Sequence, residues 1–401
     1  MARSPELIAA LERTHRCSSL PGFSQTPTDS RSLPREPSAE IKVGESVTAE
    51  PAHEKPEEAA VLTAARAGDR AAFSALSERY RHQLRVHCYR MLGSFDDAED
   101  MVQETMLRAW RGRDGFEGRS LFRTWLYRIA TNACLNVLER APRRVLPPDV
   151  APPVTASTPS SEARSKPPSA PEIPWLQPYP DSLLELPAPA ENQPDAVVAA
   201  RETIELAFVA ALQHLPPRQR TILILSDVIS WSAREVAGLL ELSVASVNSA
   251  LERARATMRA LLPPGRQEWA PSTPVTDDQR AVLKSFMNAW EKGDPAELTK
   301  LLREDARWTM PPAPLWFDGR AAIADMLRRF PPDWQGRQFK MVPTSANRQP
   351  AAAAYLRQPG ESEFRLSGVL VLRVEAGEIA EITTFSPELC AAFELPPMLD
   401  R

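Results

Sequence analysis

The distribution of proline constrains the fold of this sequence more than any other feature. The 401 residues include 40 prolines but only 15 glycines, so about one residue in ten is proline. Proline inside a helix or a central strand removes a backbone hydrogen-bond donor and clashes with the preceding turn. The prolines must therefore gather between folded domains, and their positions indicate where the domains begin and end.

Three proline-rich stretches divide the chain. Residues 1–58 combine proline with Ser, Thr and Glu, a composition that favours a disordered N-terminal tail. A misplaced start codon is an alternative origin of this tail. Residues 141–195 form a Pro-rich linker with one apolar island at 173–179, and a shorter break spans 263–274. The remaining stretches predict three folded domains, at 59–140, 196–262 and 275–401.

Cysteine spacing, hydropathy and charge exclude several classes of protein. No apolar run approaches the ~18 residues of a membrane span and no signal-peptide core is present, so we expect no membrane contact. A net charge of −4 argues against a protein that binds DNA unaided through bulk charge. The cysteines lack the spacing of a zinc ribbon or a disulfide framework, which predicts a cytoplasmic protein without metal or other cofactor: Cys17, Cys88, Cys134 and Cys390.

The first predicted domain repeats apolar side chains at helical spacing, which indicates three helices. The apolar stripe of the first helix runs from Phe73 to Met91. The second helix is predicted to start at Asp96, where a glutamate three residues later completes a capping box. The third spans 120–138 and is expected to bury Phe122, Leu126, Ile129, Ala133 and Val137.

These helices carry two contrasting polar surfaces. The second helix begins with acidic and amide side chains that suit a basic protein partner: Asp97, Glu99, Asp100, Gln103 and Glu104. The third helix and the loop before it interleave arginines with aromatic rings, the combination that neutralises phosphates and stacks on unpaired bases: Arg119, Arg123, Trp125, Tyr127 and Arg128. A solvated three-helix bundle, whose acids merely suit a helix N-terminus, explains the same pattern without a partner.

The second domain predicts a helix-turn-helix. Ser232 and Glu235 form a capping box that opens a short helix, a three-residue turn follows, and Ser243 caps a longer helix. The inner stripe of this longer helix is predicted to be Val244, Val247, Leu251, Ala254 and Met258. Its outer face would meet base edges and phosphates, through Ala245, Ser246, Asn248, Ser249, Arg253 and Arg255. An ordinary pair of antiparallel helices is the alternative.

The third domain predicts an α+β cone, with helices packed on a curved sheet. A helix capped by Thr276, a second after Gly293-Asp294 and a third at 320–329 accompany strands at 338–346, 351–357, 364–375 and 378–385. Large side chains are expected to cluster near the open end of the cone, as core and docking patch or as a site for a small apolar ligand: Trp308, Met310, Trp316, Phe317 and Trp334.

Catalysis by this third domain is the weaker alternative. The candidates for proton transfer are Asp305, expected just before a strand, and Asp318, in an Asp-Gly turn. Turn chemistry alone accounts for such an aspartate, and the domain contains no histidine. We therefore expect no enzyme activity.

The motifs resemble a known family. The first domain resembles region 2 of bacterial RNA polymerase sigma factors of the sigma-70 family, extracytoplasmic function (ECF) class, through DAEDMVQETMLRAW at 97–110, FEGRS at 116–120 and RTWLYRIATNACLN at 123–136. The second resembles region 4 through LPPRQR at 215–220, WSAREVA at 231–237 and SVASVNSALERAR at 243–255. The third resembles SnoaL-like domains, the nuclear-transport-factor-2-like cone fold that some ECF sigma factors carry as a C-terminal extension, through residues 305–320; the linker string PWLQPYPD at 174–181 is also typical of them.

The resemblance implies a multidomain fold: two all-α helical domains, region 2 and the region 4 helix-turn-helix, followed by an α+β cone. It implies that Asp97, Glu99, Asp100, Gln103 and Glu104 bind the β′ clamp of core RNA polymerase. It assigns the −10 promoter element to Arg119, Ser120, Arg123, Trp125, Tyr127, Arg128 and Asn132. It assigns the −35 element to Ser243, Ala245, Ser246, Asn248, Ser249, Arg253 and Arg255, although Asn248 and Ser249 stand where many ECF factors have Lys or Arg.

The partners implied are core RNA polymerase, through its β′ clamp and β flap, and promoter DNA, with an anti-sigma factor as a further candidate. The SnoaL-like domain would then regulate initiation. Two other hypotheses stay open: a SnoaL-like enzyme or ligand sensor fused to a helix-turn-helix, and a ligand-sensing repressor that needs no polymerase. The second of these leaves the acidic helix at Asp97 without a purpose.

Overall fold

The computed structural model describes residues 56–116, 121–155, 173–184, 204–262, 275–329 and 336–399. The expected disordered tail lies outside the described residues except for positions 56–58, as does more than half of the expected linker. Within the described part of the chain, no helix is both long enough and apolar enough to cross a membrane.

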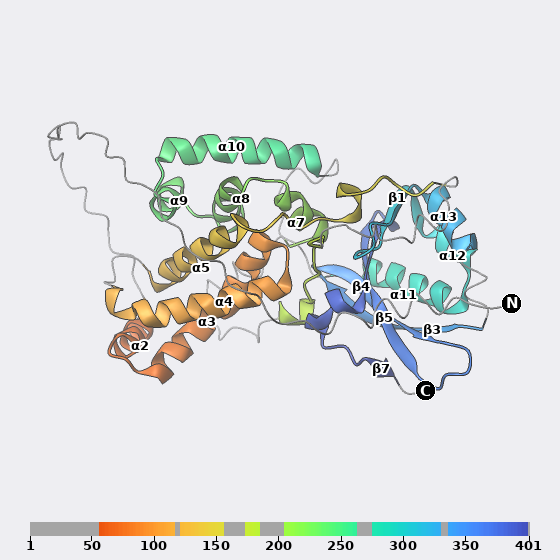
Figure 1. The fold of residues 1–401 in the computed structure, drawn as a ribbon, viewed down its shortest axis with the longest axis horizontal. Coiled ribbons are helices and arrows are strands. Elements are labelled where there is room, and N and C mark those ends of the chain that lie inside the picture. The colour runs from red at the N-terminus through yellow and green to blue at the C-terminus, as the bar shows by residue number, and fades with distance from the viewer. Residues whose placement is uncertain are drawn as a thin grey trace, which may run out of the picture. The chain divides into compact units, whose positions relative to one another are not determined.

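Helices build the first domain (Figure 1): α2 (Pro56–Arg66), α3 (Arg70–Leu92), α4 (Phe95–Gly112), the 3-10 turn η1 (Arg113–Gly115) and α5 (Phe122–Leu138). The carboxylate of Asp69 caps α3 by accepting from the backbone N–H groups of Ala71 and Ala72. Gly93 ends α3 at a positive φ of 69°, the left-handed conformation that glycine adopts without a steric penalty. This turn sets the direction in which α4 leaves.

The predicted start of α4 at Asp96 is wrong. Ser94 is the capping residue, because its side chain accepts from the backbone N–H of Asp97 and the helix begins directly after it. Asp96 therefore lies in the first turn, where a negative charge suits the helix dipole. The buried stripe of α4 follows the predicted helical spacing: Phe95, Ala98, Val102, Thr105 and Ala109.

The second domain is helical and contains the predicted helix-turn-helix: α7 (Leu206–Gln213), α8 (Pro217–Leu223), the π-helical turn η4 (Ile224–Val228), α9 (Ala233–Leu240) and α10 (Val244–Leu261). The Ser232–Glu235 capping box and the Ser243 cap are both present. Glu241 turns the chain between α9 and α10 at a positive φ of 57°. Val244 was predicted to be buried but is 43% exposed, because it is the first residue of α10 and precedes the packed turn at Val247.

The third domain combines helices with one sheet. Its helices are α11 (Asp277–Lys292), α12 (Pro295–Lys300) and α13 (Arg320–Arg329). Its strands are β1 (Leu302–Thr309), β2 (Trp316–Asp318), β3 (Gln338–Ala346), β4 (Gln349–Arg357), β5 (Phe364–Glu375), β6 (Glu378–Phe385) and β7 (Met398–Leu399). The order across the sheet is β2-β1-β6-β5-β4-β3, with β7 on β5. Asp305 lies inside β1 rather than before a strand, which corrects the prediction.

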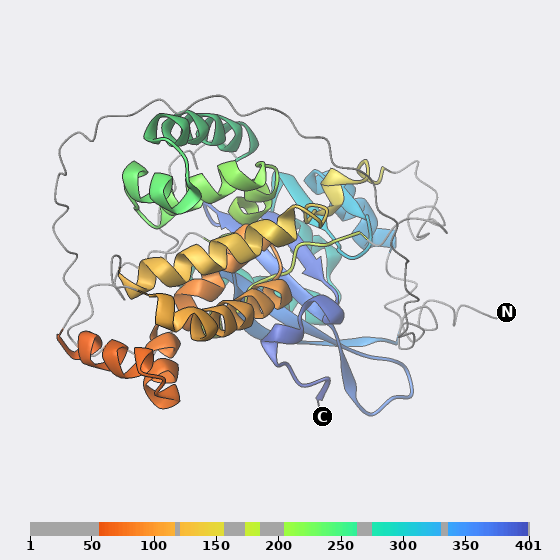
Figure 2. The same ribbon diagram turned by 60° about the vertical axis from the view of Figure 1, so that its left-hand side comes forward.

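Alternate residues of the sheet face two different cores. Ala352, Ala354, Leu370 and Leu372 belong to the core beneath α11 and α13, the inner core. Their neighbours Ala351, Ala353, Tyr355, Val369 and Val371 belong to a second core together with residues of both helical domains. Figure 2 shows helices on both sides of the sheet. The near-continuous apolar sequence of β4 and β5 follows from burial on both faces.

The described parts of the linker have defined structure. Residues 141–155 include the 3-10 turn η2 (Pro147–Asp149), and residues 173–184 include η3 (Asp181–Leu183). Val145 pairs with Trp175 in a parallel β-bridge, and Pro180 pairs with Ala346 in an antiparallel one. The apolar island that the sequence places at 173–179 therefore belongs to the packed structure.

Candidate polymerase and promoter interface

The acidic residues predicted for polymerase binding lie along α4, and several of them pair with basic groups of the chain. Asp97 forms an ion pair with Arg144 of the linker, and Glu99 with Arg85 of α3. Glu104 pairs with Arg108 at 2.6 Å. Asp100 and Gln103 are exposed, and the structure records no hydrogen bond or ion pair for either side chain with another described residue. These two side chains are the most available for a partner protein.

The linker island binds the start of the same helix. The Gln177 side chain accepts from the hydroxyl of Ser94 at 2.9 Å and donates to the Asp96 carboxylate at 2.8 Å. Its backbone N–H donates to the carbonyl of Gly93 at 3.0 Å. The hydroxyl of Tyr89 donates to the Gln177 carbonyl at 2.8 Å. One glutamine thus holds the island against the turn between α3 and α4.

The residues predicted to read the −10 element do not form one open surface. Arg123 and Trp125 are half-buried on α5, Arg128 and Asn132 are exposed, and Arg119 and Ser120 lie outside the described residues. Tyr127 was predicted to be an accessible ring, but it is 3% exposed. Its ring centroid lies 5.1 Å from His87 and 5.5 Å from Trp231 of the second domain. Tyr127 cannot stack on a base while Trp231 covers it.

The second domain also binds the first through charged and buried polar groups. Arg128 pairs with Glu241, in the turn of the helix-turn-helix, at 2.8 Å. Arg220 is 2% exposed and donates to the carbonyl of Met91 and to the side chain of Gln213. Burial lowers the pKa of Arg220 to about 10, which still leaves it charged at neutral pH. A buried cation whose two terminal nitrogens donate to fixed acceptors makes this interface specific.

The outer face of α10 is open. All seven residues predicted to read the −35 element are exposed: Ser243, Ala245, Ser246, Asn248, Ser249, Arg253 and Arg255. Three of them already have contacts within the chain, and the Ser246 hydroxyl lies 2.8 Å from that of Ser243. Ser243 caps the helix, and Arg255 donates to both oxygens of Asp227 at 2.9 and 2.6 Å, a hydrogen-bonded pair that raises the pKa of Arg255. Arg253 is an exposed cation on this face, and no side-chain hydrogen bond or ion pair is recorded for it with another described residue.

A buried histidine makes the first domain sensitive to acid. Burial, with a smaller contribution from Arg90, lowers the pKa of His87 to about 3. His87 is fully buried, and its Nε2 lies 3.0 Å from the hydroxyl of Thr131. The unfolded chain binds a proton at this residue below the ordinary histidine pKa of 6.5, whereas the folded chain does not until about pH 3. Stability is therefore lost as the pH falls through this window.

We expect the free energy of unfolding to fall by several kcal/mol between about pH 6.5 and pH 3.5, at about 1.4 kcal/mol per pKa unit for this one group. A urea titration at each pH, followed by circular dichroism, measures it. His87→Asn should lower stability at pH 7 but flatten the acid dependence. An unchanged slope in the variant would assign the acid sensitivity to other groups.

The large side chains predicted at the open end of the cone occupy different environments. Trp308 and Phe317 lie in the inner core, and the Trp308 indole donates to Thr384 at 2.9 Å. Met310 packs partly buried against that core. Trp316 is 7% exposed, and its indole donates to the carbonyl of Ala151 in the linker at 2.8 Å. Trp334 lies outside the described residues.

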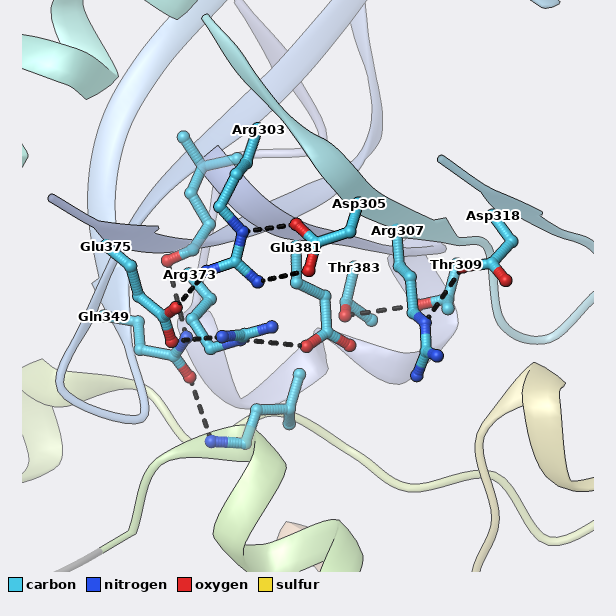
Figure 3. A network of polar contacts seen from close by, with 12 residues as sticks. Arg303, Asp305, Arg307, Thr309, Asp318, Gln349, Arg373, Glu375, Glu381 and Thr383 are labelled. Atoms are coloured by element: carbon cyan, nitrogen blue, oxygen red, sulfur yellow. Dashed lines mark hydrogen bonds and ion pairs between the residues drawn. The ribbon is translucent and has the colours of Figure 1, made fainter. Parts of the chain in front are cut away.

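The two aspartates considered for catalysis belong to a surface network of ion pairs (Figure 3). Asp305 bonds the Arg303 guanidinium at 2.9 Å, and Asp318 bonds Arg307 at 3.1 Å. The Arg303 hydrogen bond lowers the pKa of Asp305, the opposite of what a general acid near neutral pH requires. The geometry therefore supports a structural role for both.

No group of three or more His, Cys, Asp or Glu residues in the described part of the chain has the arrangement of a metal site. Cys88, Cys134 and Cys390 are buried free thiols, and burial raises the pKa of Cys134 and Cys390. Buried thiols with raised pKa values are poor nucleophiles. Cys17 lies outside the described residues.

Comparison with known proteins identifies the class. Models of three families match: Sigma-70 region 2 at residues 76–144, Sigma-70 region 4 at 205–258 and the SnoaL-like domain at 283–382. The chain is 41% identical to the ECF RNA polymerase sigma factor SigG of Mycobacterium tuberculosis over 330 residues, 82% of this chain and 85% of that protein. The protein therefore belongs to the ECF class of RNA polymerase sigma factors and carries a C-terminal SnoaL-like domain.

Two further similarities cover different shares of the chain. The ECF RNA polymerase sigma factor SigW of Bacillus subtilis is 29% identical over 49% of this chain and 91% of its own length. The crystal structure of the Mycobacterium tuberculosis ECF sigma factor SigJ covers 80% of this chain and 98% of that one, with 21% identity and a TM-score of 0.49.

Proposed function

We propose that the chain binds core RNA polymerase through the exposed side of α4, with Asp100 and Gln103 at its centre. Region 2 would read the −10 element with α5 and the preceding loop, and region 4 would read the −35 element with the outer face of α10. The observation that carries this proposal is the segregation of polar groups: acidic side chains on α4, arginines beside the half-buried Trp125 on α5, and an open polar face on α10. Region 4 would also bind the β flap of core RNA polymerase.

Polymerase is required for energetic reasons. Separating stacked base pairs costs roughly 1.4 kcal/mol per step, whereas stacking one base on an aromatic ring returns ~1–3 kcal/mol. The two aromatic residues predicted to read the −10 element, the half-buried Trp125 and the buried Tyr127, offer at most two such rings. Region 2 alone cannot offset the opening of several steps, so the polymerase must supply the remaining free energy.

The arrangement of the free chain differs from the one that reads a promoter. The −10 and −35 elements are about 25 base pairs apart, roughly 85 Å at 3.4 Å per base pair. In the structure, α5 contacts α8 and Arg128 of region 2 pairs with Glu241 of region 4. Contacts this close cannot persist when both elements are read at once. We infer that the described arrangement is a closed state and that initiation requires the two regions to separate.

The SnoaL-like domain is the proposed regulator of that separation. The outer face of its sheet shares one apolar core with helices of region 2 and region 4. Separating the two regions exposes part of this core to water, at about 25 cal/mol for each Å² of apolar surface. The domain therefore favours the closed state until polymerase, or a further partner such as an anti-sigma factor, changes the balance.

An enzymatic role has less support. Both aspartates of the cone surface are held in ion pairs with arginines, and Asp305 lacks the raised pKa of a general acid. We propose a cytoplasmic transcription factor without catalytic activity of its own, and without a cofactor. Turnover of a substrate by the purified protein would contradict this part of the proposal.

The experiment that tests promoter recognition is transcription with purified core polymerase, comparing Arg123→Ala with the wild type. Arg123 lies over the Tyr127 ring, with its guanidinium carbon 5.4 Å from the ring centroid. We expect Arg123→Ala to reduce promoter opening about tenfold, in line with the loss of one phosphate contact and one cation–π contact, while polymerase binding is unchanged. Permanganate reactivity of the −10 thymines measures opening.

The matched control is Arg79→Ala, which removes an exposed arginine from α3 of the same domain. It should open the promoter as the wild type does. Equal losses in both variants would show a general charge effect and contradict the assignment of Arg123. Absence of promoter-specific transcription by the wild type would contradict the proposed function itself.

A further inference from the structure

The linker segment that follows α5 is bound by the C-terminal domain at its far end. The backbone N–H of Val154 donates to the carbonyl of Trp316 at 2.8 Å. The indole N–H of Trp316 donates to the carbonyl of Ala151, also at 2.8 Å. The Val154 side chain packs against the inner core. One backbone bond, one side-chain bond and one apolar anchor thus hold the segment.

The strand that receives this segment is suited to binding a peptide. Within the described residues β2 lies at the edge of the sheet and pairs with β1 on one side only. Edge strands bind extended peptides through their free backbone groups. Pro152 and Pro153 have no N–H and a restricted backbone, so the segment loses little conformational freedom on docking. Val154 supplies the donor that the edge needs.

The near end of the same segment is bound to region 2. Arg144 forms an ion pair with Asp97 at the start of α4 and donates to the carbonyl of Trp175 at 3.1 Å. Leu146 is buried in the core shared with region 2. Figure 1 shows the segment in yellow between the end of α5 and β1. Residues 144–154 therefore connect the acidic surface of α4 to the edge of the cone.

We propose that the β2 edge of the SnoaL-like domain, centred on Trp316, is a binding site for an extended, proline-containing peptide. Its occupant in the free chain is the linker segment Ala151–Val154, and polymerase binding empties it. The release of the segment by polymerase rests on the proposed function. A polymerase clamp that binds at Asp97 displaces Arg144. The linker between region 2 and region 4 must also extend when the two regions separate. Both changes pull the segment away from β2.

Hydrogen exchange in the free chain tests the site without polymerase. The Val154 amide should exchange about tenfold more slowly than in a free peptide of the same sequence, as expected for one ordered hydrogen bond. Trp316→Phe keeps the aromatic ring but removes the donor to Ala151, and should raise the exchange rate of Val154 several-fold. Trp125→Phe, a matched change in region 2, should leave it unchanged. Exchange at the peptide rate in the wild-type chain, or no response to Trp316→Phe, would overturn the site.

The same amide, followed after addition of core polymerase, tests release. We expect Val154 in the bound chain to exchange at the rate of the free peptide. A chain that binds polymerase while Val154 stays protected would show that the segment remains docked, which refutes release and leaves the proposed function intact. A chain that fails to bind polymerase would refute the proposed function and the release step together, while the measurement on the free chain still decides the peptide site.

Discussion

Asp100→Arg is expected to abolish binding to core RNA polymerase without unfolding the protein. Asp100 lies on the exposed side of α4, and no ion pair or hydrogen bond to its side chain is recorded within the described residues. Substitution therefore breaks no contact of the described fold. Placing a cation against a basic partner surface replaces attraction by repulsion. Losing one interfacial charge pair costs about 2 kcal/mol or more, equivalent to an affinity at least about 30-fold weaker.

A pull-down of purified core polymerase with residues 59–401 measures this effect, and circular dichroism checks the fold. Asp278→Arg is the matched control, because Asp278 is an exposed aspartate in the first turn of another helix, α11. It makes the same charge change away from the proposed surface and should bind normally. Equal binding by the wild type and Asp100→Arg would move the polymerase contact away from α4.

Substitution of Asp97 should change polymerase binding differently from substitution of Asp100, although the sequence predicts the same role for both residues. The Asp97 carboxylate already pairs with Arg144 of the linker, so the partner must compete with a group of the same chain. Replacing Asp97 would remove an internal contact as well as a partner contact, and the two effects on binding oppose each other. Asp100 gives the clearer test for this reason.

Local signals in the sequence predicted much of the fold. The capping boxes at Ser232 and Thr276 fix two helix starts, because their partners lie only three residues away. Strands β3, β5 and β6 have the predicted bounds, and so does α13. The strand expected just after Asp305 is β1, and it begins earlier, at Leu302. Its start was misplaced because its apolar alternation is broken: the pairing with β6 shifts register between Leu302 and Arg307.

The candidate sites depended more on contacts between domains, which periodicity cannot reveal. The position of an aromatic residue on a helix face is consistent both with a ring that stacks on a base and with a buried ring. Tyr127 is buried because Trp231 of region 4 packs against it. Gln177, which binds the start of α4, was not predicted either. The only sequence signal for the role of Gln177 was the apolar island within a proline-rich linker. Apolar and aromatic residues are rare in segments that stay disordered, so the island indicated a segment that packs.

The second large effect is expected at Asn347, in the turn between β3 and β4. This residue is fully buried and adopts a positive φ of 55°. Its side-chain amide donates to the hydroxyl of Tyr89 at 2.8 Å and to the carbonyl of Ile204 at 2.7 Å, and its side-chain oxygen accepts from the N–H of Tyr179 at 2.8 Å. One side chain thus joins region 2, the linker island and the start of region 4 to the cone.

Burial raises the pKa of Tyr89, so its hydroxyl stays protonated and can accept from Asn347 while donating to Gln177. Asn347→Gly removes all three side-chain bonds but suits the left-handed backbone. The buried carbonyl of Ile204 and the buried N–H of Tyr179 then lose a partner, at about 1–3 kcal/mol each. The sum is a large fraction of the roughly 5–15 kcal/mol that stabilises a typical domain.

We therefore expect Asn347→Gly to loosen the docking of the SnoaL-like domain, seen as faster hydrogen exchange in α3 around Tyr89 and a lower denaturation midpoint. Ala376→Gly is the matched control, because Ala376 has a similar positive φ of 50° in the β5–β6 turn. Glycine relieves backbone strain at both positions, so only the lost amide distinguishes them.

If the closed state restrains initiation, Asn347→Gly should also raise transcription at limiting polymerase. A variant that is as stable as the wild type and no more active would show that the shared apolar core, rather than Asn347, holds the domains together.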